Sequence, residues 1–255
     1  MLLAVDIGNT HTVMGLFEGT ELKADWRIAS RKNATADEIG VLLAALFGGA
    51  GINASAVEEA IISSVVPDLN GPYTVACDRY LKLEPLFVGP GVKTGMPVLY
   101  ENPHDVGADR IVNAVAAIER YGAPVIVVDF GTATTFDVVG PGGEYVGGVI
   151  SPGLSSSAEA LFAKAARLHR VDVRRPSRVI GRNTEQSIQS GLFHGYASLV
   201  EGLVRRVMDE LGHEAPVVAT GGLAPIFESE MPFLTASDPG LTLEGLCLIW
   251  EKNRP

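Results

Sequence analysis

The sequence contains little cysteine, few positive charges and no long hydrophobic run. Its only cysteines, Cys77 and Cys247, lie far apart without metal-ligand spacing, which argues against a zinc site or a disulfide framework and suits a reducing cytosol. The net charge is −10, so a nucleic-acid binder, which needs a basic face, is not expected. No apolar run reaches the roughly 18 residues of a membrane span, and no basic region of a signal peptide precedes the first strand. We therefore expect a cytoplasmic protein.

Motifs of several large enzyme classes are also missing. No GxxxxGK[ST] loop is present, which excludes a P-loop enzyme, and the five histidines form no HExxH pair. No GxSxG elbow marks a hydrolase. Hydrophobic residues make up 47% of the 255 residues, enough to form cores. At this length the chain could be one large domain or two small ones.

A strand-and-turn motif occurs twice and favours two domains. The first copy reads LAVDIGNTHTV around Asp6, and the second reads IVVDFGTATTF around Asp129, 123 residues later. Each copy has an apolar run, an Asp, an apolar residue, a Gly and then small hydroxyl or amide residues, as a buried strand entering a tight turn would. The amides and hydroxyls of such a turn can hold phosphates, and the Asp can orient a cation. The repeat predicts two similar halves that face each other across a nucleotide.

Hydrophobic periodicity predicts the same plan of elements in both halves. In the first half we expect strands at 2–7, 12–17, 21–29, 60–66 and 85–88, and helices at 35–49, 69–81 and 105–120. In the second half we expect strands at 124–129, 134–139, 144–150, 216–219 and 233–234, and helices at 155–168, 184–211 and 242–252. Thr35 and Glu38 have the spacing of a capping box. The domain boundary is expected near the 105–120 helix, with domains at 1–117 and 118–255.

The turn after Asp6 is the first candidate site. Asp6 could position a magnesium ion carried by nucleotide phosphates, and the turn from Gly8 to Thr12 could donate hydrogen bonds to those phosphates. An ordinary hairpin turn would explain the same residues. The turn after Asp129 has the same two interpretations, although hydroxyls at Thr132, Thr134 and Thr135 exceed what a turn needs.

The sequence GADR at 107–110 is the second candidate, at the expected start of a helix. The free amides and positive dipole end of a helix favour an anion there. Asp109 could accept a proton from a substrate hydroxyl, and Arg110 could pair with a carboxylate or a transferring phosphoryl group. On composition alone, the simpler explanation is an Asp in the first helical turn and an Arg on a solvated face.

Two glycine patterns have both a functional and a packing interpretation. Gly221 and Gly222 follow a buried strand, where an adenine ring could lie flat against the backbone, or where a strand simply turns into a helix. Gly191, Gly195 and Gly202 fall along the predicted helix at 184–211 and would allow another helix, such as one from a second subunit, to approach closely.

Six motifs in order resemble type III pantothenate kinase, within the acetate and sugar kinase–Hsp70–actin superfamily. They are DIGNTHT, ENPHDVGADR, VDFGTATTFD, GGVISPG, GRNTEQSIQSG and ATGG, and together they extend over essentially the whole chain. The resemblance implies an α/β fold of duplicated ribonuclease H-like domains with ATP in the interdomain cleft. It implies ATP-dependent phosphorylation of pantothenate, the first step of coenzyme A biosynthesis, by a cytoplasmic homodimer.

The resemblance also implies roles for individual residues. Asp109 would be the proton acceptor, and Asp129 would hold a monovalent cation, potassium or ammonium, while magnesium would arrive with ATP. The ATP-binding residues would be Asp6, Ile7, Gly8, Asn9, Thr10, His11, Thr12, Val13 and Thr132. The pantothenate pocket would be lined by Tyr100, Gly107, Ala108, Asp109, Arg110 and Thr184.

Two other functions remain open from the sequence. Another small-molecule kinase of the same superfamily would share the fold and differ only in its acceptor. A nucleotide-sensing regulator would bind ATP without turnover and would be expected to lack a base, whereas Asp109 is present.

Overall fold

The computed structural model describes residues 1–164 and 170–254, and the chain forms two compact units. Unit 1 comprises Met1–Ala116 together with the residues from Gly240 onward, and unit 2 comprises Ala117–Pro239. The change of unit falls within helix α3 (Ala108–Tyr121). The expected division at 117 and 118 differs from this one mainly at the C-terminus, because the last helix packs with unit 1. Within the described residues, no helix is both long and apolar enough to span a membrane.

Unit 1 is built on a five-stranded mixed sheet in the order β3-β2-β1-β4-β5. Its strands are β1 (Leu2–Ile7), β2 (His11–Glu18), β3 (Glu21–Ala29), β4 (Glu59–Ser64) and β5 (Leu86–Phe87). Strands β1, β2 and β3 are antiparallel neighbours, whereas β4 and β5 run parallel to β1. β1 is apolar almost throughout because both faces of the sheet are covered, as the continuous run in the sequence predicted.

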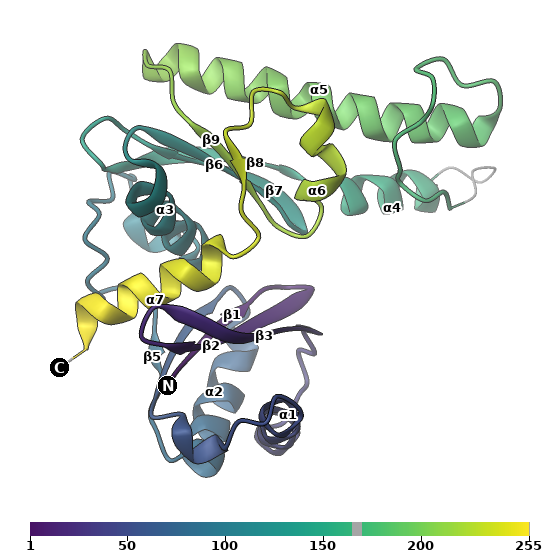
Figure 1. Ribbon diagram of the computed structural model, residues 1–255. Coiled ribbons are helices and arrows are strands. Elements are labelled where there is room, and N and C mark those ends of the chain that lie inside the picture. The colour runs from purple at the N-terminus through teal and green to yellow at the C-terminus, as the bar shows by residue number, and fades with distance from the viewer. Residues whose placement is uncertain (165–169, 255) are drawn as a thin grey trace. The chain divides into compact units, whose positions relative to one another are not determined.

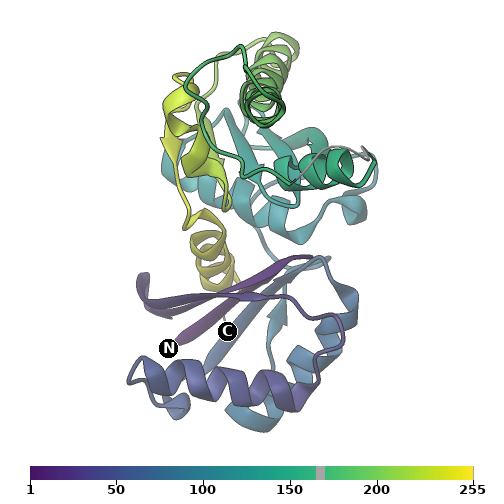
Figure 2. The same cartoon turned by 90° about the vertical axis from the view of Figure 1, so that its right-hand side faces the viewer.

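Helices cover both faces of this sheet (Figure 2). On one face, alternate residues such as Val5 and Ile62 enter a core shared with α1 (Ala36–Gly49) and α2 (Pro67–Ala76). On the other face lies α7 (Leu241–Asn253), which brings Leu243 against Gly15. The indole Nε1 of Trp250 on α7 donates to Glu59 at 2.9 Å.

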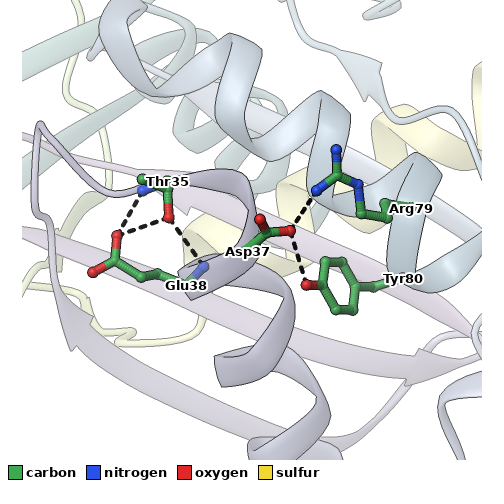
Figure 3. A network of polar contacts seen from close by, with 5 residues as sticks. All are labelled: Thr35, Asp37, Glu38, Arg79 and Tyr80. Carbon is green, nitrogen blue, oxygen red and sulfur yellow. Dashed lines mark hydrogen bonds and ion pairs between the residues drawn. The ribbon is translucent and has the colours of Figure 1, made fainter.

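Polar contacts fix the start of α1 (Figure 3). The capping box is confirmed: Thr35 Oγ1 accepts from the Glu38 amide at 3.3 Å, and the Glu38 carboxylate accepts from the Thr35 amide at 2.8 Å. Asp37 then accepts from Arg79 at 2.5 Å and from Tyr80 at 2.9 Å. These exposed contacts join α1 to the turn after α2, and exposed pairs of this kind add little to stability.

Unit 2 repeats the sheet with the order β8-β7-β6-β9-β10. Its strands are β6 (Val125–Phe130), β7 (Ala133–Val139), β8 (Tyr145–Pro152), β9 (Val217–Thr220) and β10 (Ala236–Ser237). Its helices are α4 (Leu154–Lys164), the long α5 (Thr184–Leu211) and the short α6 (Ala224–Phe227). Helix α5 runs along one face of the sheet (Figure 1), where Phe193 and Val200 pack against Val128 and Phe130. The predicted duplication is therefore confirmed strand by strand.

Several predicted boundaries were wrong. The helix expected from residue 105 begins at Ala108, because Pro103–Asp105 forms a separate 3-10 turn capped by Asn102. The last strand is Ala236–Ser237 rather than 233–234, because Phe233 and Leu234 pack against the core of unit 2 from a turn. Helix α2 ends at Ala76 and continues as a π-helical turn, Cys77–Leu81. The end expected for α4 at residue 168 lies outside the described residues.

Candidate active site

The turn after β1 places Asp6 at the end of a strand and exposes the tip of the hairpin. Asp6 is partly buried, whereas Asn9, Thr10 and His11 are exposed. The Gly8 amide donates to the His11 carbonyl at 3.0 Å, and a Cβ on Gly8 would lie 2.9 Å from that oxygen. Position 8 therefore needs a glycine for a close backbone approach, as the turn motif predicted.

Ser30, just after β3, fastens this turn. Its amide donates to the Thr10 carbonyl at 2.9 Å, and its hydroxyl donates to the Gly8 carbonyl at 2.6 Å. The same hydroxyl lies 2.8 Å from Thr12 Oγ1, within hydrogen-bond distance. Two carbonyls of the turn are therefore held by a residue about 20 positions away. Thr12 is buried, and its hydroxyl takes part in these hydrogen bonds through its contact with Ser30.

Helix α3 begins with the predicted Asp-Arg pair. The Gly107 carbonyl accepts from the amides of Arg110 at 3.1 Å and Ile111 at 3.3 Å, so Gly107 forms the cap. The Asp109 Oδ1 atom accepts from the Arg110 amide at 2.8 Å. A Cβ on Gly107 would lie 2.5 Å from this carboxylate, so glycine leaves room for it. Burial raises the pKa of Asp109, while the Arg110 amide and the Arg110 charge oppose the rise.

A cavity of about 440 Å³ adjoins the start of α3 in unit 1. Its walls come from the end of β4, the loop at 89–98 and the segment from Pro103 to Ala108. Gly107 and Ala108 line it, as predicted for a substrate pocket, whereas Tyr100, Asp109 and Arg110 are not among its lining residues. Tyr100 is partly buried in the preceding loop, and Arg110 is buried. The volume is that of a pocket for a small molecule.

Asp129 lies near the end of β6, and the turn that follows is held by hydrogen bonds from Gly153 and Ser156 at the start of α4. The Thr132 carbonyl accepts from the Gly153 amide at 3.2 Å and from Ser156 Oγ at 2.8 Å. A Cβ on Gly153 would lie 2.4 Å from the Thr132 carbonyl oxygen and 2.6 Å from that of Gly131. The GGVISPG motif therefore provides a glycine where two backbones meet, and Thr132 stays exposed.

Gly221 follows β9 and lies in the turn that leads to α6, as one of its two interpretations predicted. Its φ is +89°, and a Cβ there would lie 2.4 Å from Asp129 Oδ1 and 2.8 Å from the Phe130 backbone. The glycine thus lets the strand end at β9 pass close to the Asp129 carboxylate. The expected strand-to-helix turn is therefore confirmed, and the adenine contact stays a prediction.

Thr184 is the first residue of α5 in unit 2 and is exposed. Asn183 caps the helix, because its side chain accepts from the Gln186 amide at 2.8 Å. Within unit 2, Thr184 therefore lies exposed in the first turn of a capped helix.

Comparisons with known proteins show the family to which the chain belongs. The family model for type III pantothenate kinase matches residues 2–206. The chain belongs to the type III pantothenate kinase family. A type III pantothenate kinase of Anaeromyxobacter sp. (strain Fw109-5) is 54% identical, and one of Brevibacillus brevis is 52% identical, each over 254 residues with all of both chains covered. The chain is therefore a kinase.

The fold of this pantothenate kinase family member is also found in sugar kinases. A solved structure from Sinorhizobium meliloti, described as a 2-dehydro-3-deoxygalactonokinase, superposes with a TM-score of 0.57. It covers 100% of this chain and 97% of its own, at 13% identity, so the likeness concerns the fold alone. The predicted α/β fold of duplicated domains, as in sugar kinases, is confirmed.

Sequence reasoning missed two residues of this pantothenate kinase that contact candidate site residues. Ser30 follows an exposed strand and carries no local signal for its contacts with residues 8–12. Asp137 is fully buried and accepts from Tyr145 at 2.8 Å and from Thr135 at 3.1 Å. Thr135 is the β7 neighbour of Asp129, and the period-2 alternation of Thr135 and Asp137 could have indicated that they share its face.

Proposed function

We propose that this kinase transfers the terminal phosphoryl group of ATP to the hydroxyl of pantothenate with Asp109 as the proton acceptor. Phosphorylation of pantothenate, the first step of coenzyme A biosynthesis, is the reaction of the family. The observation that carries the role of Asp109 is its position: a carboxylate in the first turn of α3, beside a small-molecule cavity and beside Arg110.

Asp109 suits the task because its carboxylate is oriented by a backbone amide and its pKa is raised by burial. The Arg110 amide orients one carboxylate oxygen, and burial makes the group more basic than an ordinary aspartate. A loose phosphoryl-transfer transition state needs positioning and charge stabilisation more than covalent help. Arg110 would supply the positive charge, as a clamp on a carboxylate or on the phosphoryl oxygens.

The residues proposed for ATP are Asp6 to Val13 and Thr132. The exposed tip of the first hairpin, held in shape by Ser30, offers amides and hydroxyls to phosphate oxygens. The oxygen donors around Asp6 fit a magnesium ion that keeps several of its waters, and the ion would neutralise charge on the phosphates. Tyr100, Gly107 to Arg110 and Thr184 are proposed for pantothenate.

The function is tested by ADP release with ATP, magnesium and pantothenate, compared with acetate and simple sugars as acceptors. We expect release to depend on pantothenate. Release with a sugar and none with pantothenate would identify another kinase of the same fold. ATP binding without release for any acceptor would favour the regulator instead. A cytoplasmic location is proposed with the function, and the low cysteine content suits it.

A monovalent cation, potassium or ammonium, is proposed at Asp129. Thr135 and Thr220 are the in-register neighbours of Asp129 on β7 and β9, so a carboxylate and two hydroxyls share one face. Among the residues that the structure describes, no three His, Cys, Asp or Glu side chains come together. The donors are oxygens only, which fits a hard cation and not zinc.

We expect turnover to require potassium or ammonium and to fall sharply in sodium alone. Asp129→Asn should remove this selectivity, because an amide lacks the charge that would hold the ion. The measurement is turnover against cation concentration for both proteins, with Asp25→Asn on β3 as an exposed control. Full activity of the unmodified protein in a sodium-only buffer would remove the cation from the mechanism.

A homodimer is proposed through α5. Leu192 and Leu203 on this helix pack against the core of unit 2, but Leu199 remains 36% exposed. Gly191 and Gly195 lie on the exposed side, and no described residue comes within 4 Å of a Cβ added at either position. Such a face allows close approach of a second helix.

Leu199→Asp should shift the protein to a monomer and lower turnover together with the dimer fraction. An unpaired charge buried at an interface costs on the order of 2–5 kcal/mol, enough to dissociate a moderate dimer. Val41→Asp is the matched control, because Val41 is a helical residue that is 62% exposed in unit 1. Mass in solution and turnover are measured together. A folded, fully active Leu199→Asp monomer would contradict the proposed dimer requirement.

A further inference from the structure

Ser63 on β4 is a fully buried serine whose hydroxyl is not used by the fold. Its Oγ has no hydrogen-bond partner among the described residues, although its exposed fraction is 0%. Folded proteins pair nearly all such groups, because an unpaired buried hydroxyl is destabilising. Ser190, another buried serine, shows the ordinary case, since its hydroxyl donates to the Val179 carbonyl.

The strand register places Ser63 beside Asp6. In the parallel pair of β1 and β4, Asp6 is opposite Ser63. Val5 and Ile62, their chain neighbours, point into the core with α1 and α2, so Asp6 and Ser63 share the opposite face. Neighbouring strands lie about 4.8 Å apart, so a rotation of the Ser63 side chain brings its hydroxyl within reach of the carboxylate of Asp6.

The bend after β4 leads to the start of α3. Val65 follows Ser63 by two residues, and its side chain lies 3.5 Å from a Cβ added to Gly107. Ser63 therefore belongs to the same end of the sheet as Gly107 and the helix turn that carries Asp109. The fold places the unused hydroxyl among the residues proposed for phosphoryl transfer.

The second half of the chain contains the same pair. In the parallel strands β6 and β9, Asp129 is opposite Thr220, which is 2% exposed. Both sheets have the same strand order, so Ser63 and Thr220 occupy equivalent positions. A buried hydroxyl beside the strand-end aspartate is thus a feature of both halves. This shared feature does not show as a sequence repeat, because the segment between β6 and β9 in unit 2 is much longer than the segment between β1 and β4 in unit 1.

We infer that Ser63 is a positioning residue that fixes the carboxylate of Asp6 when magnesium–ATP binds. This inference rests on the proposed role of Asp6. A serine hydroxyl can donate to one carboxylate oxygen and leave the other to accept from a metal-bound water. Residues that orient a metal-binding group in this way typically change metal affinity or activity about tenfold to a hundredfold when they are removed.

Ser63→Ala is the direct test, with steady-state kinetics at several magnesium concentrations. We expect the KM for magnesium–ATP to rise about tenfold, while the KM for pantothenate stays within about twofold. The melting temperature should stay the same or rise, because an unpaired buried hydroxyl is removed. Ser63→Thr, which keeps the hydroxyl, should restore the magnesium–ATP dependence. Ser190→Ala should show the opposite pattern, a lower melting temperature with unchanged magnesium–ATP kinetics.

Combining Ser63→Ala with Asp6→Asn separates this inference from the proposed function. If Ser63 acts through Asp6, the double variant should be no worse than Asp6→Asn alone, because the two effects are coupled. An impaired Asp6→Asn beside a kinetically normal Ser63→Ala would overturn the inference and leave the role of Asp6 intact. A normal Asp6→Asn would overturn both. A Ser63→Ala variant that only melts earlier would make Ser63 a packing residue and overturn the inference.

Discussion

Asp109→Asn should lose about a hundredfold to ten-thousandfold in turnover while it stays folded and still binds pantothenate. A general base contributes about this much to catalysis, and an amide cannot take the proton of the substrate hydroxyl. The variant keeps the oxygen that accepts from the Arg110 amide, so the first turn of α3 should be preserved. Turnover and pantothenate binding by calorimetry measure the two parts separately.

The raised pKa of Asp109 also predicts how catalysis and stability depend on pH. The group must be ionised to act, so kcat/KM of the unmodified enzyme should fall as the pH drops through a value above that of an ordinary aspartate. Because the folded-state pKa lies above the unfolded one, the unfolded chain loses this proton first as the pH rises. Stability is therefore lost between the two pKa values and stays reduced above them.

The Asn variant cannot ionise, so at pH 7 it should melt no lower than the unmodified enzyme. Asp68→Asn, an exposed aspartate in the first turn of α2, is the control and should change neither turnover nor its pH profile. Turnover of Asp109→Asn within threefold of the unmodified enzyme would contradict the assignment.

Asp6→Asn should raise the magnesium–ATP requirement about tenfold to a hundredfold, the range expected when a contact to a charged group is lost. The carboxylate at the end of β1 can orient the water shell of the metal, whereas an amide lacks the charge. Pantothenate binding should stay nearly unchanged, because Asp6 is proposed to act on the metal and phosphates of ATP and not on pantothenate. Initial rates against magnesium–ATP and against pantothenate distinguish the two effects.

Asp25→Asn, on the exposed strand β3, provides the control for loss of one negative charge from unit 1. It should leave both dependences as they are. If Asp6→Asn needs no more magnesium–ATP than this control, Asp6 is a turn residue and the proposed metal contact is wrong.

The two hairpins could be predicted from the sequence because their signals lie close together along the chain. An apolar run, an Asp and a Gly fix a buried strand and its turn within about ten residues, and the structure has both turns as expected. The capping box of α1 was predictable for the same reason, since its partners lie three residues apart. The resemblance to a family supplied the role proposed for Asp109, which position alone left open.

Features that depend on pairing between distant residues were not predictable. The contact of Ser30 with Gly8 joins residues 22 apart, and the close approach of Gly221 to Asp129 depends on the register of β6 and β9. A single sequence carries the composition of each strand but not the neighbour of each residue. The same limit explains why the last helix was assigned to the second domain.

The position of α7 has a consequence for how the chain acquires its structure during synthesis. Unit 2 is continuous in sequence, so all its parts have left the ribosome once Pro239 has emerged. The sheet of unit 1 is made first, yet the helix that covers one of its faces is made only after all of unit 2, and its Gly245 packs tightly against the Val112 carbonyl of α3. Domains generally fold in the order of their synthesis, but here unit 1 cannot complete its core until α7 has emerged. A nonsense mutation just before α7 would therefore damage the unit that contains Met1.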